Sequence, residues 1–271
     1  MADATTGMLD TYRILASARM RSDLQYRVSF VLFTLSQFTV TILDFVAILI
    51  LFGAVPALAH WSLREVTFLY GLANLSFGIA DLLVSPIETV QQHIQTGTFD
   101  RLLLRPASPI VQVIADQFSL RRLGKVAEGA LVFGIGCRVA GIHWTTARIA
   151  LTALSVVTGS VIFSGLWVLT SCVCFWWVEG REAQNALTYG GGFLAQYPLG
   201  IYGAWLRRLL AYAVPIAFVN YFPAVYVLDR HDRLGLPAWA SFAAPGVALV
   251  VVIAAAMAWR VGIRHYRSTG S

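Results

Sequence analysis

Three carboxylates are the residues of this chain best placed to do chemistry, because each lies inside a long apolar run. Asp44 lies mid-way along the first run, Asp81 toward the end of the second, and Glu128 inside the third. A charge at the centre of a bilayer costs about 2.5–3.5 kcal/mol on insertion scales, so each should face a partner or a wet cavity. A cation-binding or polar path is one interpretation, favoured for Asp44. Interhelical hydrogen bonding, or a place nearer the headgroups, is favoured for Asp81 and Glu128.

Enzyme and metal chemistry find little support. The five histidines are scattered without a metal-binding spacing, and no GxSxG nucleophile elbow occurs. Ser160 and Ser164 fit close helix packing better than catalysis. Cys172 and Cys174 lie two residues apart and face different sides of a helix, so they and Cys137 fit small buried side chains. We therefore expect no active site, no metal site and no cofactor on this chain.

A nucleotide-binding P-loop is also missing. That motif needs GxxxxGK followed by Ser or Thr, because the lysine reaches the phosphates and the hydroxyl holds magnesium. Lys125, the only lysine, follows Gly124, but Val126 comes next and Ser119 stands where the first glycine belongs. Any ATP and Mg²⁺ must therefore be bound by a partner protein.

The composition indicates an all-α integral membrane protein. Hydrophobic residues make up 58% and charged residues 13%, with a mean hydropathy of +0.68. Soluble domains carry about 25% charged residues. The apolar runs reach the ~20 residues that span a bilayer as a helix and lack the alternation of a barrel strand. The net charge of +6 comes from arginines at the ends of these runs, which indicates topology and no nucleic-acid partner.

The hydropathy pattern predicts one transmembrane domain over residues 1–271, with six transmembrane helices. An N-terminal interfacial helix over 8–22 has Tyr12 and Ala16 on its apolar face and basic residues on the other. The predicted spans are 28–54, 66–86, 119–140, 149–178, a fifth from near 184, and 246–264.

Residues 184–228 allow either one span or two. Glycines 190–192 and the prolines at 198, 215 and 223 interrupt this stretch. One span with both termini cytoplasmic places thirteen of the twenty basic residues on the cytoplasmic side, whereas two spans place the basic C-terminal tail outside. We therefore predict that 205–228 is an outer re-entrant segment before the last span.

The loop between the second and third spans, residues 87–106, has an unusual pattern. Ile87, Val90 and Ile94 recur at helical spacing, and the sequence Thr-Gly-Thr then breaks the helix. A short element follows and ends before Pro106, because the residue before proline avoids the helical conformation. Its apolar side chains either project as a plug for another protein or fold back on the chain's own span ends. The residues alone leave both open. These side chains are Phe99, Leu102 and Leu103, framed by Asp100, Arg101 and Arg105.

The loop motif TGTFDRLLLRPASP resembles that of the type-2 ABC exporter permeases, in the branch related to viologen and multidrug exporter permeases. The order of interfacial helix, six spans and the segment YPLGIY…VPIAFVNYFPA is similar to the same family over nearly the whole chain. The loop motif is fairly specific, and the rest is mainly a hydropathy pattern. The resemblance implies that the loop is a coupling helix that docks on an ABC ATPase subunit. The docking residues it implies are Thr96, Gly97, Phe99, Asp100, Arg101, Leu102, Leu103 and Arg105, with a smaller second contact at Glu179 and Arg181.

The same resemblance implies a multi-pass subunit of the cell inner or plasma membrane, paired with a second permease chain as a homo- or heterodimer. ATP and Mg²⁺ would be bound by the partner ATPase. Asp44 and the aromatic side chains of the spans favour export of an amphipathic, cationic compound that is drug-like or lipid-like. The alternatives are an ion-coupled secondary transporter that uses Asp44 and Glu128, and a non-transporting membrane scaffold. The predicted substrate path comprises Asp44, Phe38, Phe45 and Glu128.

Overall fold

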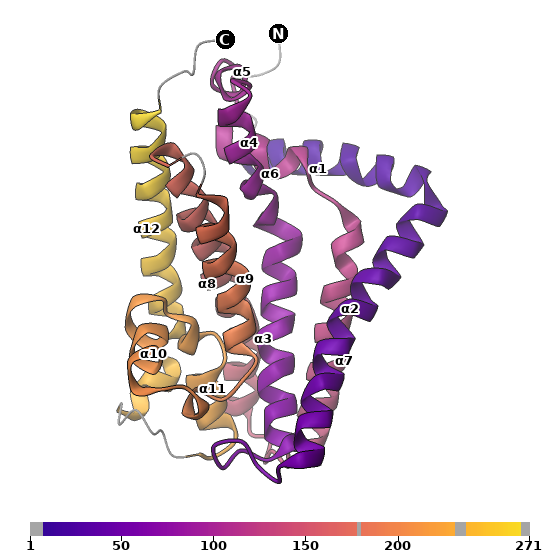
Figure 1. Ribbon diagram of the computed structural model, residues 1–271, viewed down its shortest axis with the longest axis vertical. Helices are drawn as coiled ribbons and strands as arrows, with labels where there is room; N and C mark the ends of the chain where they lie inside the picture. Colours follow the sequence, from indigo (N-terminus) through magenta and orange to yellow (C-terminus); the bar gives the residue numbers. More distant parts are fainter. Residues whose placement is uncertain (1–7, 178–179, 231–236, 267–271) are drawn as a thin grey trace.

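Apolar runs bounded by turns and prolines form the long helices of the bundle. The computed structural model describes residues 8–177, 180–230 and 237–266, and within these ranges it contains helices and no strand. The helices that run along the bundle are drawn upright in Figure 1. They are α2 (Arg27–Ala54), α3 (Leu63–Val84), α7 (Leu123–Val139), α8 (Thr146–Ser171), α9 (Arg181–Ala195) and α12 (Ala244–His265).

Shorter elements gather toward the two ends of the bundle (Figure 1). We call these ends the α5 end and the α10 end. Toward the α5 end lie η1 (Ser85–Thr89), α4 (Val90–Gln95), α5 (Phe99–Leu103), α6 (Pro109–Asp116), η2 (Leu120–Arg122) and η3 (Cys172–Phe175). Toward the α10 end lie η4 (Leu199–Ile201), α10 (Ala204–Arg208), the π-helix η5 (Leu209–Ala213), η6 (Ile216–Phe218), α11 (Tyr221–Val227) and η7 (Ala238–Phe242).

Four helical stretches of the described chain are long and apolar enough to cross a bilayer. These are α2, α3 with its continuation to Gln95, α8 with its continuation to Phe175, and α12. The bent pair Ala204–Ala213 and Ile216–Val227 would be a fifth if it counts as one span. α7 has 17 residues, which gives a length of about 26 Å. The predicted all-α fold is confirmed, and the six-span count stays a prediction.

The first helix, α1 (Met8–Gln25), crosses the α5 end of the bundle instead of running along it (Figure 1). The ring of Tyr12 packs edge-on against Phe118, with centroids 6.3 Å apart. On the polar side, the Arg19 guanidinium lies 2.7 Å from a carboxylate oxygen of Asp116 at the end of α6. α1 is therefore fastened to the region between α6 and α7, while its place in a membrane interface stays a prediction.

Glycines bring α3 and α7 into backbone contact. A Cβ added to Gly71 would lie 2.4 Å from the Cα of Phe133, and one added to Gly129 would lie 2.6 Å from the backbone nitrogen of Leu75. Gly136 makes a similar approach further along α7. Small residues allow the close helix packing that is common in membrane proteins. This pair of helices is the centre of the bundle.

α2 lies at the edge of the bundle (Figure 1). Of its 28 residues only Phe45 and Ile48 are buried. Its close contact is with α7, where a Cβ added to Gly124 would lie 2.3 Å from the carbonyl oxygen of Thr34. Phe45 packs inward with its ring centroid 5.2 Å from that of Tyr70. The outer face of α2 has no cover within the described part of the chain.

The expected interruption of the fifth apolar run at glycines 190–192 is wrong, because α9 continues through them to Ala195. A Cβ added to Gly192 would lie 2.7 Å from the ring of Phe77 on α3. Gly191 and Gly192 therefore serve close packing, whereas nothing lies within 4 Å of a Cβ added to Gly190. The helix ends shortly before Pro198, where a break was also expected.

The predicted re-entrant region has an irregular path. Its halves, Ala204–Ala213 and Ile216–Val227, meet at an angle of 74° at a break that contains Pro215. Beyond the second half, the Arg230 guanidinium forms a bidentate ion pair with the carboxylate of Glu65 in the first turn of α3. This pair fixes the end of the bent segment to the central helix pair. The bend is confirmed, and whether the segment re-enters or spans stays a prediction.

The glycine contact between α3 and α7 yields a stability prediction. Gly129→Val would drive its side chain into the α3 backbone, and overpacking of this kind costs about 1–3 kcal/mol. We expect a clear drop in the thermal unfolding midpoint of the purified full-length chain in detergent. Gly134→Ala on the same helix is the matched control, because nothing lies within 4 Å of its added Cβ. Equal midpoints for the two variants would contradict the packing argument.

Candidate functional site

A polar and aromatic stripe runs along one side of α3 and its continuation. Residues spaced by three and four share one face of a helix. Because α3 packs against α7, α8 and α9, this face lies within the bundle, and Asp81 and Ser85 on it are buried. The stripe consists of Tyr70, Asn74, Phe77, Asp81, Ser85 and Glu88.

Two cations from the start of α7 lie against the middle of the stripe. The Lys125 Nζ is 2.8 Å from Asp81 Oδ2, and the Arg122 Nε is 3.6 Å from Oδ1. Asp81 is only 2% exposed, so this is a buried ion pair. The Lys125 ammonium also lies 5.7 Å from the centroid of Phe77 and 5.5 Å from that of Tyr189. The interpretation of Asp81 as an interhelical partner agrees with this geometry.

An aromatic cluster backs the lysine. The rings of Phe77 and Trp167 lie 4.9 Å apart, and those of Trp167 and Tyr189 lie 5.6 Å apart. The Trp167 Nε1 donates a hydrogen bond of 2.5 Å to a carboxylate oxygen of Glu88. Side chains from α3, α8 and α9 thus meet the cations of α7 at one place.

Asp44 from α2 faces the same place across a cavity of about 260 Å³. The cavity has polar groups from four helices, so it can hold a hydrated or charged ligand. Asp44 itself is exposed in the isolated chain. The residues that line the cavity are Gln37, Val40, Thr41, Asp44, Asn74, Phe77, Lys125, Tyr189, Gly192, Phe193 and Gln196.

A second polar cavity, of about 470 Å³, continues the stripe toward the α5 end. Ser85, Glu88 and Arg122 contribute to its wall. Glu88 and Arg122 also touch the cluster around Lys125, so the two cavities lie along one line of polar groups. We call this line the polar seam. It comprises Asp44, Asn74, Asp81, Ser85, Glu88, Arg122 and Lys125.

The other residues of the predicted path are placed differently. Phe38 is half-buried on α2, and Phe45 packs into the core against Tyr70 and away from the cavity. Glu128 is fully buried, and its carboxylate interacts with the Tyr70 hydroxyl of α3. That hydroxyl also donates to the carbonyl of Thr41 at 3.1 Å. The interpretation of Glu128 as an interhelical partner agrees with this placement.

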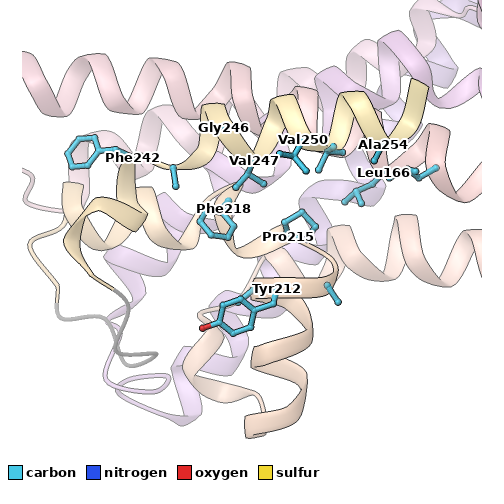
Figure 2. Close-up of a pocket in the computed structure, with 14 residues that line it drawn as sticks. Leu166, Tyr212, Pro215, Phe218, Phe242, Gly246, Val247, Val250 and Ala254 are labelled. Atoms are coloured by element: carbon cyan, nitrogen blue, oxygen red, sulfur yellow. The ribbon is translucent and has the colours of Figure 1, made fainter. Parts of the chain in front are cut away.

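A third cavity, of about 710 Å³, lies between α8, α12 and the bent segment. Figure 2 shows Pro215 and Phe218 of that segment facing Val247 and Val250 of α12. The hydroxyl of Tyr212 is the single polar side-chain group in its wall. Such a groove fits an acyl chain and cannot orient a polar ligand, so the polar seam is the better candidate for recognition.

The predicted docking loop is built from α4, α5 and α6 at the α5 end (Figure 1). Its expected apolar face is confirmed, because Ile87, Val90 and Ile94 are buried. The expected break is formed by Gly97, which has a left-handed φ of 67°. The amide of Gln112 on α6 donates to two loop carbonyls at 3.0 and 2.8 Å and holds the loop in place.

The expectation that Phe99 and Leu102 project as an apolar plug is wrong. Phe99 is fully buried, with its centroid 5.6 Å from that of Phe175 and 5.0 Å from that of Tyr266. Leu102 is also buried. Both side chains fold back because the ends of α8 and α12 offer an aromatic pocket beside the loop. The alternative left open by the sequence holds for these two residues.

The side chains that do face outward from the loop are different. Leu104 is 86% exposed and Leu103 is 39% exposed. They are flanked by exposed arginines at 101 and 105. Thr96 is exposed, while Gly97 and Asp100 are half-buried. We call Leu103, Leu104, Arg101, Arg105 and Thr96 the α5 tip.

The predicted second contact lies at the start of α9. Glu179 lies outside the described residues, and Arg181 begins α9 with a side chain that is not described. Gly180 between them is buried.

Helices that are long and apolar enough to cross a bilayer indicate a multi-pass membrane protein. A family model described as ABC-2 family transporter protein matches residues 38–270. The chain therefore belongs to the ABC-2 transporter family, whose members form the membrane component of ABC transporters. No curated protein and no solved structure matches the chain. The match leaves α1 and the first part of α2 outside.

Several site residues were missed in the sequence. The three- and four-residue spacing from Asn74 through Phe77 to Glu88 was present as a signal, but it lies in a run dominated by its apolar residues. The local sequence around Lys125 indicates only an incomplete P-loop motif. Leu104 was passed over because nothing in a run of three leucines tells which one faces outward.

The buried ion pair gives a stability prediction. Asp81→Asn would leave Lys125 and Arg122 without their shared carboxylate, and breaking a buried pair from one side costs about 3–5 kcal/mol. We expect a large loss in the thermal midpoint of the detergent-solubilised chain. Glu128→Gln is the control, because it changes a buried carboxylate that forms no ion pair within the described residues. A larger loss for the control would refute the assignment.

Proposed function

We propose that this chain is the transmembrane permease subunit of an ATP-driven ABC exporter. The observation that carries the proposal is the α5 tip, where Leu104 stands 86% exposed between two arginines. An apolar side chain so placed gains most from burial against another protein. A groove on an ABC ATPase subunit that accepts Leu104, and acidic groups that accept the arginines, would supply it. Because this chain has no P-loop motif, the partner would bind and hydrolyse the ATP.

The proposed mechanism transmits closure of the ATPase subunits through the α5 tip. The α5 tip is connected to the polar seam through consecutive elements of the chain. η1, which carries Glu88, continues directly into α4, and α5 follows. Phe99 anchors the loop on the ends of α8 and α12. A displacement of the tip would therefore shift α3, α8 and α12 together and alter the seam. Substrate moves because the two states bind it differently.

A second permease chain, identical or homologous, would cover α2. Asp44 is exposed on that helix, and a carboxylate facing lipid costs about 2.5–3.5 kcal/mol on insertion scales. Pairing two chains with their α2 helices inward would place Asp44 and its cavity at a shared central path. The proposal includes this dimer, two ATPase subunits with ATP and Mg²⁺, and no nucleic-acid partner.

The proposed topology has six spans in the cell membrane with both termini cytoplasmic. α7 and the unit of α9 with the bent segment supply the two spans beyond the four long helices. α1 and the end of α12 lie at the α5 end, which carries the basic loop residues (Figure 1). An excess of arginine marks the cytoplasmic side. α1 would lie in the interface on that side.

The proposed substrate is an amphipathic, cationic compound, drug-like or lipid-like. Around the cavity, Asp44, Asp81 and Glu88 supply three carboxylates against the two cations Lys125 and Arg122. The aromatic rings at the cavity add apolar contact area and cation–π attraction. Ion-coupled transport through Asp44 and Glu128 is the second candidate, because Glu128 is a fully buried carboxyl that forms no ion pair within the described chain.

The α5 tip is tested by Leu104→Glu in the tagged full-length chain. A charge in an apolar docking groove should weaken ATPase binding by about 2 kcal/mol or more, as at other interface anchors. We expect vanadate-sensitive ATP hydrolysis to be lost from the purified complex, while the chain's thermal midpoint stays unchanged.

Leu104→Met keeps an apolar tip and should retain the ATPase. Phe99→Ala should instead lower the thermal midpoint, because it empties a buried aromatic site and such truncations cost about 3–5 kcal/mol. Unaltered ATPase recovery with Leu104→Glu would count against docking at this tip. Proton-driven transport by a chain that never recovers an ATPase would end the exporter proposal.

Asp44→Asn tests the path. The side chain is exposed in the isolated chain, so we expect expression and thermal stability to remain close to those of the original chain. Nucleotide-driven uptake of ethidium, a cationic dye, into inverted vesicles should fall at least about tenfold, because one charge–charge attraction in a low-dielectric site is lost. Loss of folded protein in parallel with transport would assign Asp44 a structural role.

A further inference from the structure

Lys125 occupies a position that a ligand cation would be expected to take. Its ammonium lies 5.7 Å from the centroid of Phe77 and 5.5 Å from that of Tyr189, and the tilted ring of Trp167 packs against Phe77 with centroids 4.9 Å apart. Rings at such distances form the kind of cage that attracts organic cations. Lys125 and both rings are part of the wall of the Asp44 cavity. The cage therefore opens into the space where a ligand can enter.

Direct contact anchors this ammonium on one side only, and Asp44 attracts it at longer range from the cavity side. Asp81 holds it at 2.8 Å from the direction of the α5 end, and Arg122 shares that carboxylate at 3.6 Å. On the cavity side, the carboxylate of Asp44 is exposed. A lysine ammonium sits on a flexible four-carbon stem, so it can leave the rings while it stays near Asp81. Arg122 keeps part of the ion pair during such a movement.

We propose that Lys125 is a specificity-determining residue: it fills the Phe77–Tyr189 cage as a resident cation that an incoming aromatic organic cation must displace. The carboxylate of Asp44 would then bind the incoming charge, while the rings of the cage take its apolar part. Ligands without a positive charge gain nothing by displacing Lys125. A ligand therefore binds only if its contacts outweigh the free energy of displacing Lys125 from the rings. Cations that interact with both the rings and Asp44 can meet this condition. The proposal rests on the proposed function, since it concerns the substrate cavity of that permease.

The test measures binding without nucleotide, using two probes of the same shape and opposite charge. Tetraphenylphosphonium and tetraphenylborate are titrated by equilibrium dialysis against the full-length chain, purified in detergent with whatever subunits it retains. Lys125→Met removes the resident charge and keeps the length of the side chain. We expect it to bind the phosphonium on the order of tenfold more tightly, because the cage is vacated and a repulsive charge is lost. Binding of the borate should not improve.

Further variants test whether the gain comes from the lost charge and the vacated cage. Lys125→Arg keeps the charge and should keep the weak phosphonium binding of the original chain. If Lys125→Met does not fold, the double variant Lys125→Met with Asp81→Asn also removes the carboxylate that the lysine leaves behind. It vacates the cage without changing the net charge, so a smaller gain is expected. Adding Phe77→Leu to either methionine variant should abolish the gain, because it breaks the cage.

Two outcomes would overturn the proposal. Unchanged phosphonium affinity in the methionine variants would show that Lys125 only supports the α3–α7 packing. A loss of borate binding without a phosphonium gain would show that Lys125 is an anchor for anions. The measurement needs no ATPase, so a chain that recovers none would refute the exporter proposal and still decide the role of Lys125.

Discussion

The backbone contact between α3 and α7 is the constraint on which the rest of the structure depends. Glycines on both helices remove the side chains that would keep them apart, and a Cβ at Gly71 or Gly129 would collide with the facing backbone. Because the two helices touch, a lysine on α7 can reach an aspartate on α3 within the bundle. Lipid offers no hydrophobic drive for helix association, so such packing and the ion pair it permits must hold the centre together.

The two functional regions depend on this centre in different ways. The polar seam is assembled at the contact itself, with α9 brought to Phe77 by Gly192 and α2 brought to α7 by Gly124. The α5 tip is an extension of α3, fixed by Phe99 in the aromatic pocket between α8 and α12. A push at the tip and a change in the seam are thus mechanically connected through α3. This connection is what a permease driven from outside its own chain requires.

Asp81 and Glu88 each have a partner in direct contact: Lys125 and Arg122 lie against Asp81, and the indole of Trp167 donates to Glu88. Asp44 lies on the least covered helix and faces an open cavity, where Lys125 attracts it at longer range. A carboxylate beside aromatic rings can attract a cation. The second cavity, lined by Glu88 and Arg122, provides a polar approach from the α5 end.

The sequence by itself determined the all-α membrane fold and the approximate helix bounds, because apolar runs of span length and their proline breaks are local properties. It also determined the helical face of Ile87 and Ile94 before the loop. Only the tertiary structure decided that Phe99 turns inward and Leu104 outward, because that choice depends on an aromatic pocket supplied by residues far along the chain. The role of Lys125 was likewise undetermined, since its carboxylate and its rings come from α3 and α9, and no local pattern records such a meeting.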